Sequence, residues 1–339
     1  KDISLEASFE NVTVKRGVVN PSYLSLAGAD FDISQLIRDG VIDGDSMYGY
    51  TTRYLSWLFP HISITPYGWL FISEFQPITR PFTTCSLNID TTYTHIRLSE
   101  TPPMVVKRGL TLLYWDIETN ASTGNFSNYE DPNDYVICIS VVLDEDGIVT
   151  NHLFYWIPFD YDKVVAKATF HASPTESQML TSFFKFWALH RPDAHITYNG
   201  TKFDFDYLIN RVTFLHVELP PLGKITNLAP TRRMVYFPRP FRAPGEYRDS
   251  ATEVVMPGVE HIDLVLYCRR FLPGLPNYRL ETVAQRTLGV GKTGLDYHEM
   301  FRIVRERDPD GLIALAEYSI QDAVLLHRLE GKLGVLKQL

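Results

Sequence analysis

The sequence has few cysteines, no long apolar run and no excess of positive charge, and each absence excludes a class of protein. Its three cysteines, Cys85, Cys138 and Cys268, lie far apart without a Cys-x-x-Cys pair, so we expect neither a disulfide framework nor a zinc site, but a reducing compartment. No apolar stretch approaches the roughly 18 residues of a bilayer span, so no membrane partner is expected. The formal net charge of −8 argues against a protein that coats nucleic acid non-specifically.

The 339 residues divide into two regions of different pattern, and this length suffices for two domains, each with its own core. Residues 1–105 contain runs of β-branched and aromatic residues, which predict a β-rich N-terminal domain. Pro102 and Pro103 mark the boundary. From 106 to 339 the pattern alternates between strands and helices, so we predict an α/β domain there.

Within residues 106–339, local signals predict the order of the elements. The apolar run at 110–116 predicts a buried strand, and Asp146-Gly147 between two apolar runs predicts a hairpin. Ser173-Pro174-Thr175-Glu176 is a capping box with Pro at the first helical position, which predicts a helix to about His190. Further elements are expected at residues 195–198 (strand), 203–215 (helix), 280–288 (helix, stopped by Gly289) and 311–336 (helix).

Asp116 and Glu118 form the first acidic motif, at the end of the predicted buried strand. Residues two apart on a strand point to one face and lie about 6.6 Å apart along the chain, so both carboxylates can share one metal. An Asp-x-Glu triplet is common, and alone it is more often solvated surface charge. The apolar residues that precede Asp116 favour a metal site, because burying carboxylates at the end of a strand costs free energy unless they bind something.

Two further motifs follow in order along the chain. Asp204 comes directly after Phe203 at the start of a predicted helix, where a simple helix N-cap is the alternative explanation. Asn199 precedes Asp204 in the same motif, and its alternative explanation is that it is an ordinary turn residue. Tyr318 and Asp322 stand four apart on a predicted helix and share one face. As an isolated pair they would most often be structural, but a phenol beside a metal-bound carboxylate can align an attacking water.

The joint occurrence of these motifs predicts a two-metal site. Two cations about 3.5–4 Å apart can activate a water and stabilise the entering and leaving oxygens of a displacement at phosphorus. Hard oxygen ligands without a His or Cys cluster favour Mg²⁺ or Mn²⁺ over zinc. We expect Asp116 to bridge the ions, Glu118 and Asp322 to complete the first, and Asp204 to hold the second, directly or through water.

A basic, aromatic segment at residues 231–258 is a candidate DNA contact. Guanidinium groups follow phosphates and aromatic faces stack on unpaired bases, although a solvated surface loop explains the composition equally well. Lys292 belongs to a sequence that resembles the end of a phosphate-binding P-loop. Arg286 stands where that motif requires its first glycine, so Lys292 is instead a candidate DNA-phosphate contact. The candidate DNA-contacting arginines of the 231–258 segment are Arg232, Arg233, Arg239 and Arg242.

Together these residues resemble the exonuclease region of the family-B DNA polymerases over about residues 106–330. The resemblance implies an RNase H-like mixed sheet flanked by helices, two-metal hydrolysis, and 3′→5′ removal of misinserted nucleotides from the single-stranded 3′ end of a primer-template. It also implies DNA contacts by Asn199 and Phe203. The matching segments are Asp116-Ile117-Glu118-Thr119, Tyr198-Asn199-Gly200-Thr201-Lys202-Phe203-Asp204, Leu275-Pro276-Asn277-Tyr278-Arg279-Leu280 and, in the tyrosine-bearing form, Tyr318-Ser319-Ile320-Gln321-Asp322.

The palm, fingers and thumb motifs of that family do not occur in these 339 residues. We therefore expect the chain to be part of a longer polymerase, whose other domains are its partners together with a candidate processivity factor. The expected location is inside the cell at the site of DNA replication, with nucleus, organelle and virus-infected cell left open. The alternatives are a free-standing DNA- or RNA-trimming exonuclease and a non-catalytic nucleic-acid-binding scaffold of the same fold.

Overall fold

The computed structural model describes two compact units, Lys1–Arg80 with Leu87–Val106, and Pro81–Ser86 with Lys107–Leu339. Side chains are not described for the strands at 5–8, 11–14 and 231–237, or for residues 249–253. The backbone is described for residues 5–8, 11–14, 63, 70–79, 83, 88–98, 109–124, 126–225, 231–237, 249–291 and 294–336.

In its described residues, the first unit contains short antiparallel strand pairs and one 3₁₀ turn. Its strands agree with the β-rich character expected for this region. Arg97 places its guanidinium 4.5 Å from the ring centroid of Phe71 across one of these pairs. The pairs are β1 (Leu5–Ser8) with β2 (Asn11–Val14), β3 (Leu70–Ile72) with β6 (Ile96–Leu98), and β4 (Gln76–Pro77) with β5 (Ile89–Asp90).

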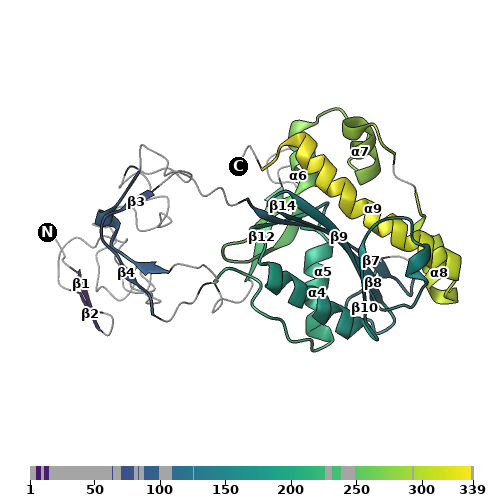
Figure 1. Cartoon of the computed structure of the whole chain (residues 1–339), viewed down its shortest axis with the longest axis horizontal. Coiled ribbons are helices and arrows are strands. Elements are labelled where there is room, and N and C mark those ends of the chain that lie inside the picture. The colour runs from purple at the N-terminus through teal and green to yellow at the C-terminus, as the bar shows by residue number, and fades with distance from the viewer. Residues whose placement is uncertain are drawn as a thin grey trace. The chain divides into compact units, whose positions relative to one another are not determined.

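The second unit is built on a six-stranded mixed sheet in the order β10-β9-β8-β7-β11-β14 (Figure 1). Strands β7, β8 and β9 are antiparallel, whereas β11 lies parallel to both β7 and β14. This is the RNase H-like mixed sheet expected from the sequence. The strands are β7 (Thr111–Asn120), β8 (Tyr135–Glu145), β9 (Ile148–Tyr155), β10 (Thr169–Ala172), β11 (Ala194–Thr197) and β14 (Glu260–Asp263).

The hairpin between β8 and β9 has the turn that its sequence predicts. Asp146 and Gly147 have φ values of 55° and 84°, the pair of positive angles that a type I′ turn requires. The backbone N–H of Gly147 also donates to Oδ1 of Asp144 at 2.8 Å. The turn therefore fixes the register of the long β8–β9 ladder.

Helices cover both faces of the sheet, and the alternation of β7 shows which helix lies on which face. Leu113, Trp115 and Ile117 pack in a core cluster with α4 and α5. Leu112 and Tyr114 pack in a second cluster with α9. The helices are α4 (Glu176–His190), α5 (Asp204–Phe214), α6 (Leu264–Phe271), α7 (Leu280–Leu288), α8 (Tyr297–Glu306) and α9 (Pro309–Leu333).

Helix α4 ends at His190 as predicted, but it begins two residues later than the capping box indicates. Its N-cap is Thr175, whose hydroxyl accepts from the N–H of Gln178 at 3.3 Å, so the assignment of Ser173 as the cap is wrong. The reason lies in Glu176. Its carboxylate accepts the N–H of Val136 at 2.8 Å and cannot return to a cap.

Two other elements differ from the sequence-based expectations. Helix α9 starts at Pro309, before the predicted residue 311, because the carboxylate of Asp308 caps it by accepting from the N–H of Gly311. Residues 231–258, for which a solvated surface loop was one explanation, contain an antiparallel strand pair, β12 (Thr231–Phe237) with β13 (Asp249–Val255). This pair was not predicted.

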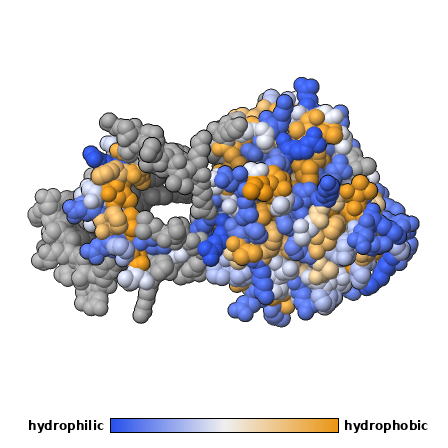
Figure 2. Space-filling model, in the orientation of Figure 1, coloured by the Kyte–Doolittle hydropathy of each residue, from blue (hydrophilic) through white to orange (hydrophobic). Residues whose placement is uncertain are grey.

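Helix α8 is also absent from those expectations. Arg302 bonds Glu299 on one side, and Glu306 and Asp308 on the other, at 2.6 to 3.2 Å. Figure 2 shows a hydrophilic patch at its right edge, where Figure 1 places α8. In the described part of the chain, no helix combines the length and apolar character that crossing a bilayer demands.

Candidate metal centre

Strand β7 and helix α9 bring three carboxylates together on one face of the sheet. Asp116 and Glu118 follow Leu112 and Tyr114 in the strand's alternation, so they lie on the face covered by α9. Asp322 comes from α9 and is 2% exposed. The prediction that the first and third motifs meet is thus realised in the fold.

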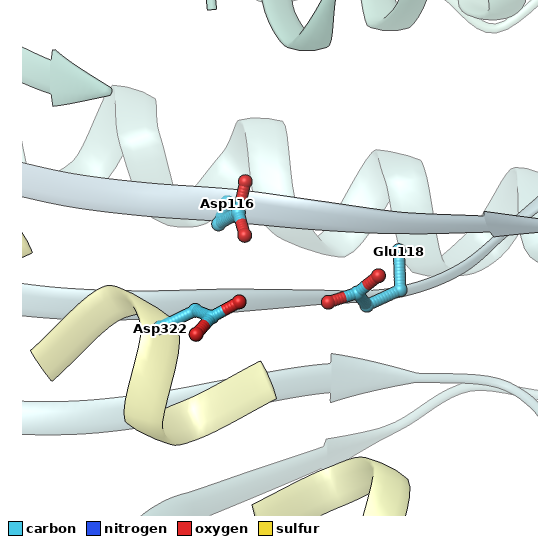
Figure 3. Close-up of side chains that lie close together, drawn as sticks. All are labelled: Asp116, Glu118 and Asp322. Carbon is cyan, nitrogen blue, oxygen red and sulfur yellow. The ribbon is translucent and has the colours of Figure 1, made fainter. Parts of the chain in front are cut away.

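The three carboxylates are close enough to hold a metal ion between them. One oxygen of each lies within 4.8 Å of the others. Figure 3 shows the carboxylates of Glu118 and Asp322 pointing toward each other, with that of Asp116 beside them. Glu118 is 9% exposed, and like charges this close repel strongly where water is scarce. A divalent cation would neutralise them, and oxygen donors of this kind suit a hard ion.

A polar contact beside these carboxylates joins α9 to strand β8. Ser319, 1% exposed, hydrogen-bonds Sγ of Cys138 with its hydroxyl at 3.3 Å. Cys138 lies opposite Glu118 on β8. Burial raises the pKa of the Cys138 thiol, and the charges of Glu118 and Asp116 raise it further. The thiol therefore stays protonated and can donate to Ser319.

Tyr318 lies one helical turn before Asp322 on α9. Its ring is partly buried and packs against the core cluster that contains residues of β8, β9 and α8. The four-residue spacing puts the phenol and the carboxylate on neighbouring positions of one helix face. The sequence prediction of a shared face is therefore met.

Asp204 lies outside the group of three but close to it. It is the first residue of α5, and the N-cap position belongs to Phe203, so the simple N-cap explanation of Asp204 is wrong. Burial raises the pKa of Asp204 well above its ordinary value, and the charges of Asp116 and Asp263 raise it further. Asp204 is 5% exposed. Asp204 is thus a buried carboxyl that feels the charge of Asp116 without belonging to the group of three.

The turn that leads from β11 into α5 has a constrained backbone. Asn199 has φ of 68°, a left-handed conformation that Asn adopts more readily than most residues. A Cβ on Gly200 would collide with the side chain of Thr197, so glycine is required there. Oγ1 of Thr197 in turn hydrogen-bonds Nε2 of His261 at 3.0 Å.

Asp263 belongs to this region and was missed in the sequence. Its carboxylate accepts from the backbone N–H of Asn199 at 2.7 Å, of Thr201 at 3.1 Å and of Val265 at 3.2 Å. The last bond makes it the N-cap of α6. An aspartate before a helix could have been read as a cap from the sequence, but its contact with the second motif could not.

Arg211, on α5, has contacts that the sequence did not indicate. It is 1% exposed and pairs with both carboxylate oxygens of Glu176 at 2.9 and 2.8 Å. Its third nitrogen donates to the carbonyls of Tyr129 and Asp131, both at 2.9 Å. Arg211 thereby ties α5 and α4 to the loop that joins β7 to β8.

Asp134 lies in the same loop and bonds two of its backbone N–H groups. Its carboxylate accepts from the N–H of Ser122 at 2.6 Å and of Asn128 at 2.7 Å. Burial acts to raise its pKa, but the N–H groups of Asn128 and Ser122 outweigh this and lower it. The loop that follows β7 is therefore tied to Arg211 on one side and to Asp134 on the other.

The predicted DNA contacts are only partly described by the structure. Phe203 is partly buried, packs against the core and lies 5.3 Å from the ring of Tyr207. Asn199 occupies the turn described above. Arg232 and Arg233 lie on β12, where the backbone alone is described. The other three, Lys292, Arg239 and Arg242, lie outside the described residues.

Comparison with known proteins identifies the class. The family described as DNA polymerase family B, exonuclease domain, matches residues 45–283. The chain therefore belongs to the family-B DNA polymerases and carries their exonuclease domain. The match ends before Tyr318 and Asp322, so the third motif rests on its own residues and on the fold.

Individual relatives are viral and archaeal polymerases. The chain is 23% identical to the DNA polymerase catalytic subunit of Rhesus cytomegalovirus, over 91% of this chain and 30% of that protein. It is 28% identical to that of Tupaiid herpesvirus 1, over 80% of this chain and 23% of the relative. It is 31% identical to a DNA polymerase of Pyrococcus glycovorans, over 67% of this chain and 25% of the relative. The chain spans less than a third of these relatives.

Proposed function

We propose that this chain is the proofreading unit of a family-B polymerase and hydrolyses the 3′-terminal phosphodiester of DNA with two Mg²⁺ or Mn²⁺ ions. The observation that supports this most is the meeting of the first and third motifs, with three carboxylate oxygens within 4.8 Å. The electrostatic influence of Asp116 on buried Asp204 supports a place for a second ion.

Each residue has a proposed task. Asp116, Glu118 and Asp322 would hold one ion, and Asp116 with Asp204 the other. When bound, such ions supply an activated water and stabilise charge on the phosphoryl oxygens. The phenol of Tyr318 would hydrogen-bond the attacking water and hold it in line with the leaving 3′ oxygen.

The DNA would approach as a single-stranded 3′ end of a primer-template. We propose residues 106–339 as the exonuclease domain and 1–105 as a separate N-terminal domain, with the remaining polymerase domains and a processivity factor as further partners at the site of replication. The proposed DNA-contacting residues are Asn199, Phe203, Arg232, Arg233, Arg239, Arg242 and Lys292.

Asp116→Ala combined with Glu118→Ala tests the activity. Wild-type protein with Mg²⁺ or Mn²⁺ should release mononucleotides from a DNA primer end, and the double variant should release none while keeping its circular dichroism. A matched control removes two exposed carboxylates elsewhere, Asp160→Ala with Asp162→Ala, and should keep full activity. Degradation by the Asp116/Glu118 variant at the wild-type rate would refute the site.

The same assay separates the alternatives. A free-standing trimming enzyme that acts on RNA would degrade RNA ends at least as fast as DNA ends. A non-catalytic scaffold would release no mononucleotides from either and would bind Mn²⁺ weakly. The family match to a polymerase exonuclease domain favours the proofreading unit over both.

A further inference from the structure

Asp263 is a buried carboxylate beside the metal centre that the three motifs do not contain. It ends strand β14, directly opposite Thr197 in the parallel ladder with β11, and it is 7% exposed. Both strands end at this edge of the sheet. Asp263 therefore lies next to the turn through which β11 enters α5 and Asp204.

Its hydrogen bonds go mainly to that turn. The two N–H groups of Asn199 and Thr201 are bound by different oxygens of the carboxylate, Oδ1 at 2.7 Å and Oδ2 at 3.1 Å. Both oxygens of the side chain are thus required as acceptors. An amide in its place has one acceptor oxygen and would direct an NH₂ donor at a backbone N–H.

Helix capping alone does not account for this arrangement. Capping of α6 uses Oδ1, through the N–H of Val265 at 3.2 Å. One oxygen suffices for an N-cap, and Asp263 makes a shorter bond with that oxygen to Asn199, more than sixty residues away in the chain. The second oxygen, Oδ2, accepts from the backbone N–H of Thr201.

The bonded turn is one that needs support. Asn199 has a left-handed backbone, with φ of 68°, and Gly200 lies against Thr197 with no room for a Cβ. Asp263 holds the N–H groups on both sides of Gly200. The residues that follow lead directly to Asp204, the first residue of α5.

We propose that Asp263 is a positioning residue, which holds the turn at residues 198–203 so that Asp204 lies beside Asp116. This inference rests on the proposed exonuclease function. Asp263 touches neither the DNA nor an ion in this scheme and acts through the backbone. Its loss should therefore weaken turnover and also metal binding measured without DNA. Because Asn199 and Phe203 of the same turn are proposed DNA contacts, metal binding in the absence of DNA is the measurement that isolates this role.

The test compares Asp263→Asn with a control at the other end of the same strands, Asp193→Asn. Asp193 accepts from the backbone N–H of Thr111 and from Lys224, so it also joins strands through a carboxylate. Asp263→Asn should lower kcat and weaken Mn²⁺ binding, each about 10- to 100-fold. Mn²⁺ binding is measured calorimetrically without DNA.

The control should lose thermal stability but keep wild-type kcat and Mn²⁺ affinity. Equal losses of kcat in both variants would reduce Asp263 to a structural role and overturn the proposal, as would wild-type Mn²⁺ binding in Asp263→Asn. Wild-type protein that releases no nucleotides would instead refute the proposed function.

A second variant covers the case in which Asp263→Asn does not fold. Gly200→Ala displaces the same turn from its other side and leaves the α6 cap intact. It should lower kcat and Mn²⁺ affinity in the same proportion. A Gly200→Ala protein with wild-type kcat and Mn²⁺ affinity would show that the position of this turn does not matter, and would overturn the proposal.

Discussion

Trp115 donates its indole N–H to Nδ1 of His195 at 3.3 Å in the core behind Asp116. Both residues are completely buried, and the bond joins β7 to β11 on the face opposite the metal centre. The bond also sets the tautomer, because an Nδ1 that accepts leaves the proton on Nε2. Burial lowers the pKa of His195 well below its ordinary value, and neighbouring His261 lowers it further, so the ring is neutral.

Trp115→Phe should lower the free energy of unfolding by more than the loss of packing from the smaller ring would cause. The substitution leaves Nδ1 of His195 buried without its donor, which adds about 1–3 kcal/mol. Urea unfolding followed by circular dichroism measures the loss. Trp156→Phe is the comparison, because its indole donates to the backbone carbonyl of Val136 at a partly buried position. A Trp115→Phe protein more stable than Trp156→Phe would contradict the expectation.

Metal binding should stabilise the folded chain. Crowded carboxylates repel each other when no ion is present, and an ion that binds only the folded state raises the free energy of unfolding by about 2.7 kcal/mol at 100 times its dissociation constant. Thermal unfolding with Mn²⁺ and with a chelator measures the difference. Asp322→Asn should remove most of the increment, while Asp160→Ala should retain it. An identical melting temperature with and without Mn²⁺ would argue against a metal centre.

Arg211→Met should destabilise the protein by about 3–5 kcal/mol, because it leaves the charge of Glu176 buried without its partner. Adding Glu176→Gln should recover part of this loss, since the amide can still accept from Val136 without carrying a charge. Urea unfolding of the two single variants and the double variant measures the coupling. Additive losses would show that the pair does not act as a unit.

Arg211→Met should also loosen the loop between β7 and β8, since the carbonyls of Tyr129 and Asp131 lose their donor. Hydrogen exchange across residues 121–134 measures this local effect. Exchange should speed up more in the loop than in the rest of the domain. Exchange unchanged in the loop but raised throughout α4 would contradict the assigned contact.

Acid should destabilise the protein through a histidine cluster under α4. Burial, then the charges of His171 and His190, lower the pKa of His152 to about 4, against an opposing effect of Glu145. Burial also lowers the pKa of His171. Between about pH 6.5 and pH 4 the unfolded chain therefore binds protons that the folded one does not. Stability should fall as the pH drops through this window.

The histidine contribution is isolated by substitution. His152→Gln should flatten the dependence of melting temperature on pH between 6.5 and 4. His298→Gln, at an exposed position of α8, should leave it unchanged. Parallel pH curves for His152→Gln and wild type would mean that other groups cause the acid sensitivity.

Short-range periodicity explains what could be predicted from the sequence. The two-residue repeat of a strand puts Asp116 and Glu118 on one face, and the helical repeat does the same for Tyr318 and Asp322. The Asp146-Gly147 hairpin follows equally from local backbone preference. Each of these needs only the geometry of one element, and each agrees with the structure.

What could not be predicted depends on partners distant in the chain. The sequence around Glu176 indicates one half of a capping box, but in the structure its carboxylate accepts from Arg211 and from the N–H of Val136 instead. Asp263 looks like a helix cap, and nothing near it in sequence indicates the turn at Asn199. Buried polar groups take whichever partner the fold supplies, so their roles become visible only when the strands are placed side by side.

The division of the three clustered carboxylates between strand β7 and helix α9 has a consequence for synthesis. Asp116 leaves the ribosome long before Asp322. The group of three carboxylates therefore stays incomplete until α9 has emerged and docked on the sheet. Truncation anywhere ahead of α9 would leave the first two acidic motifs in place but remove Asp322, the carboxylate that completes the group of three.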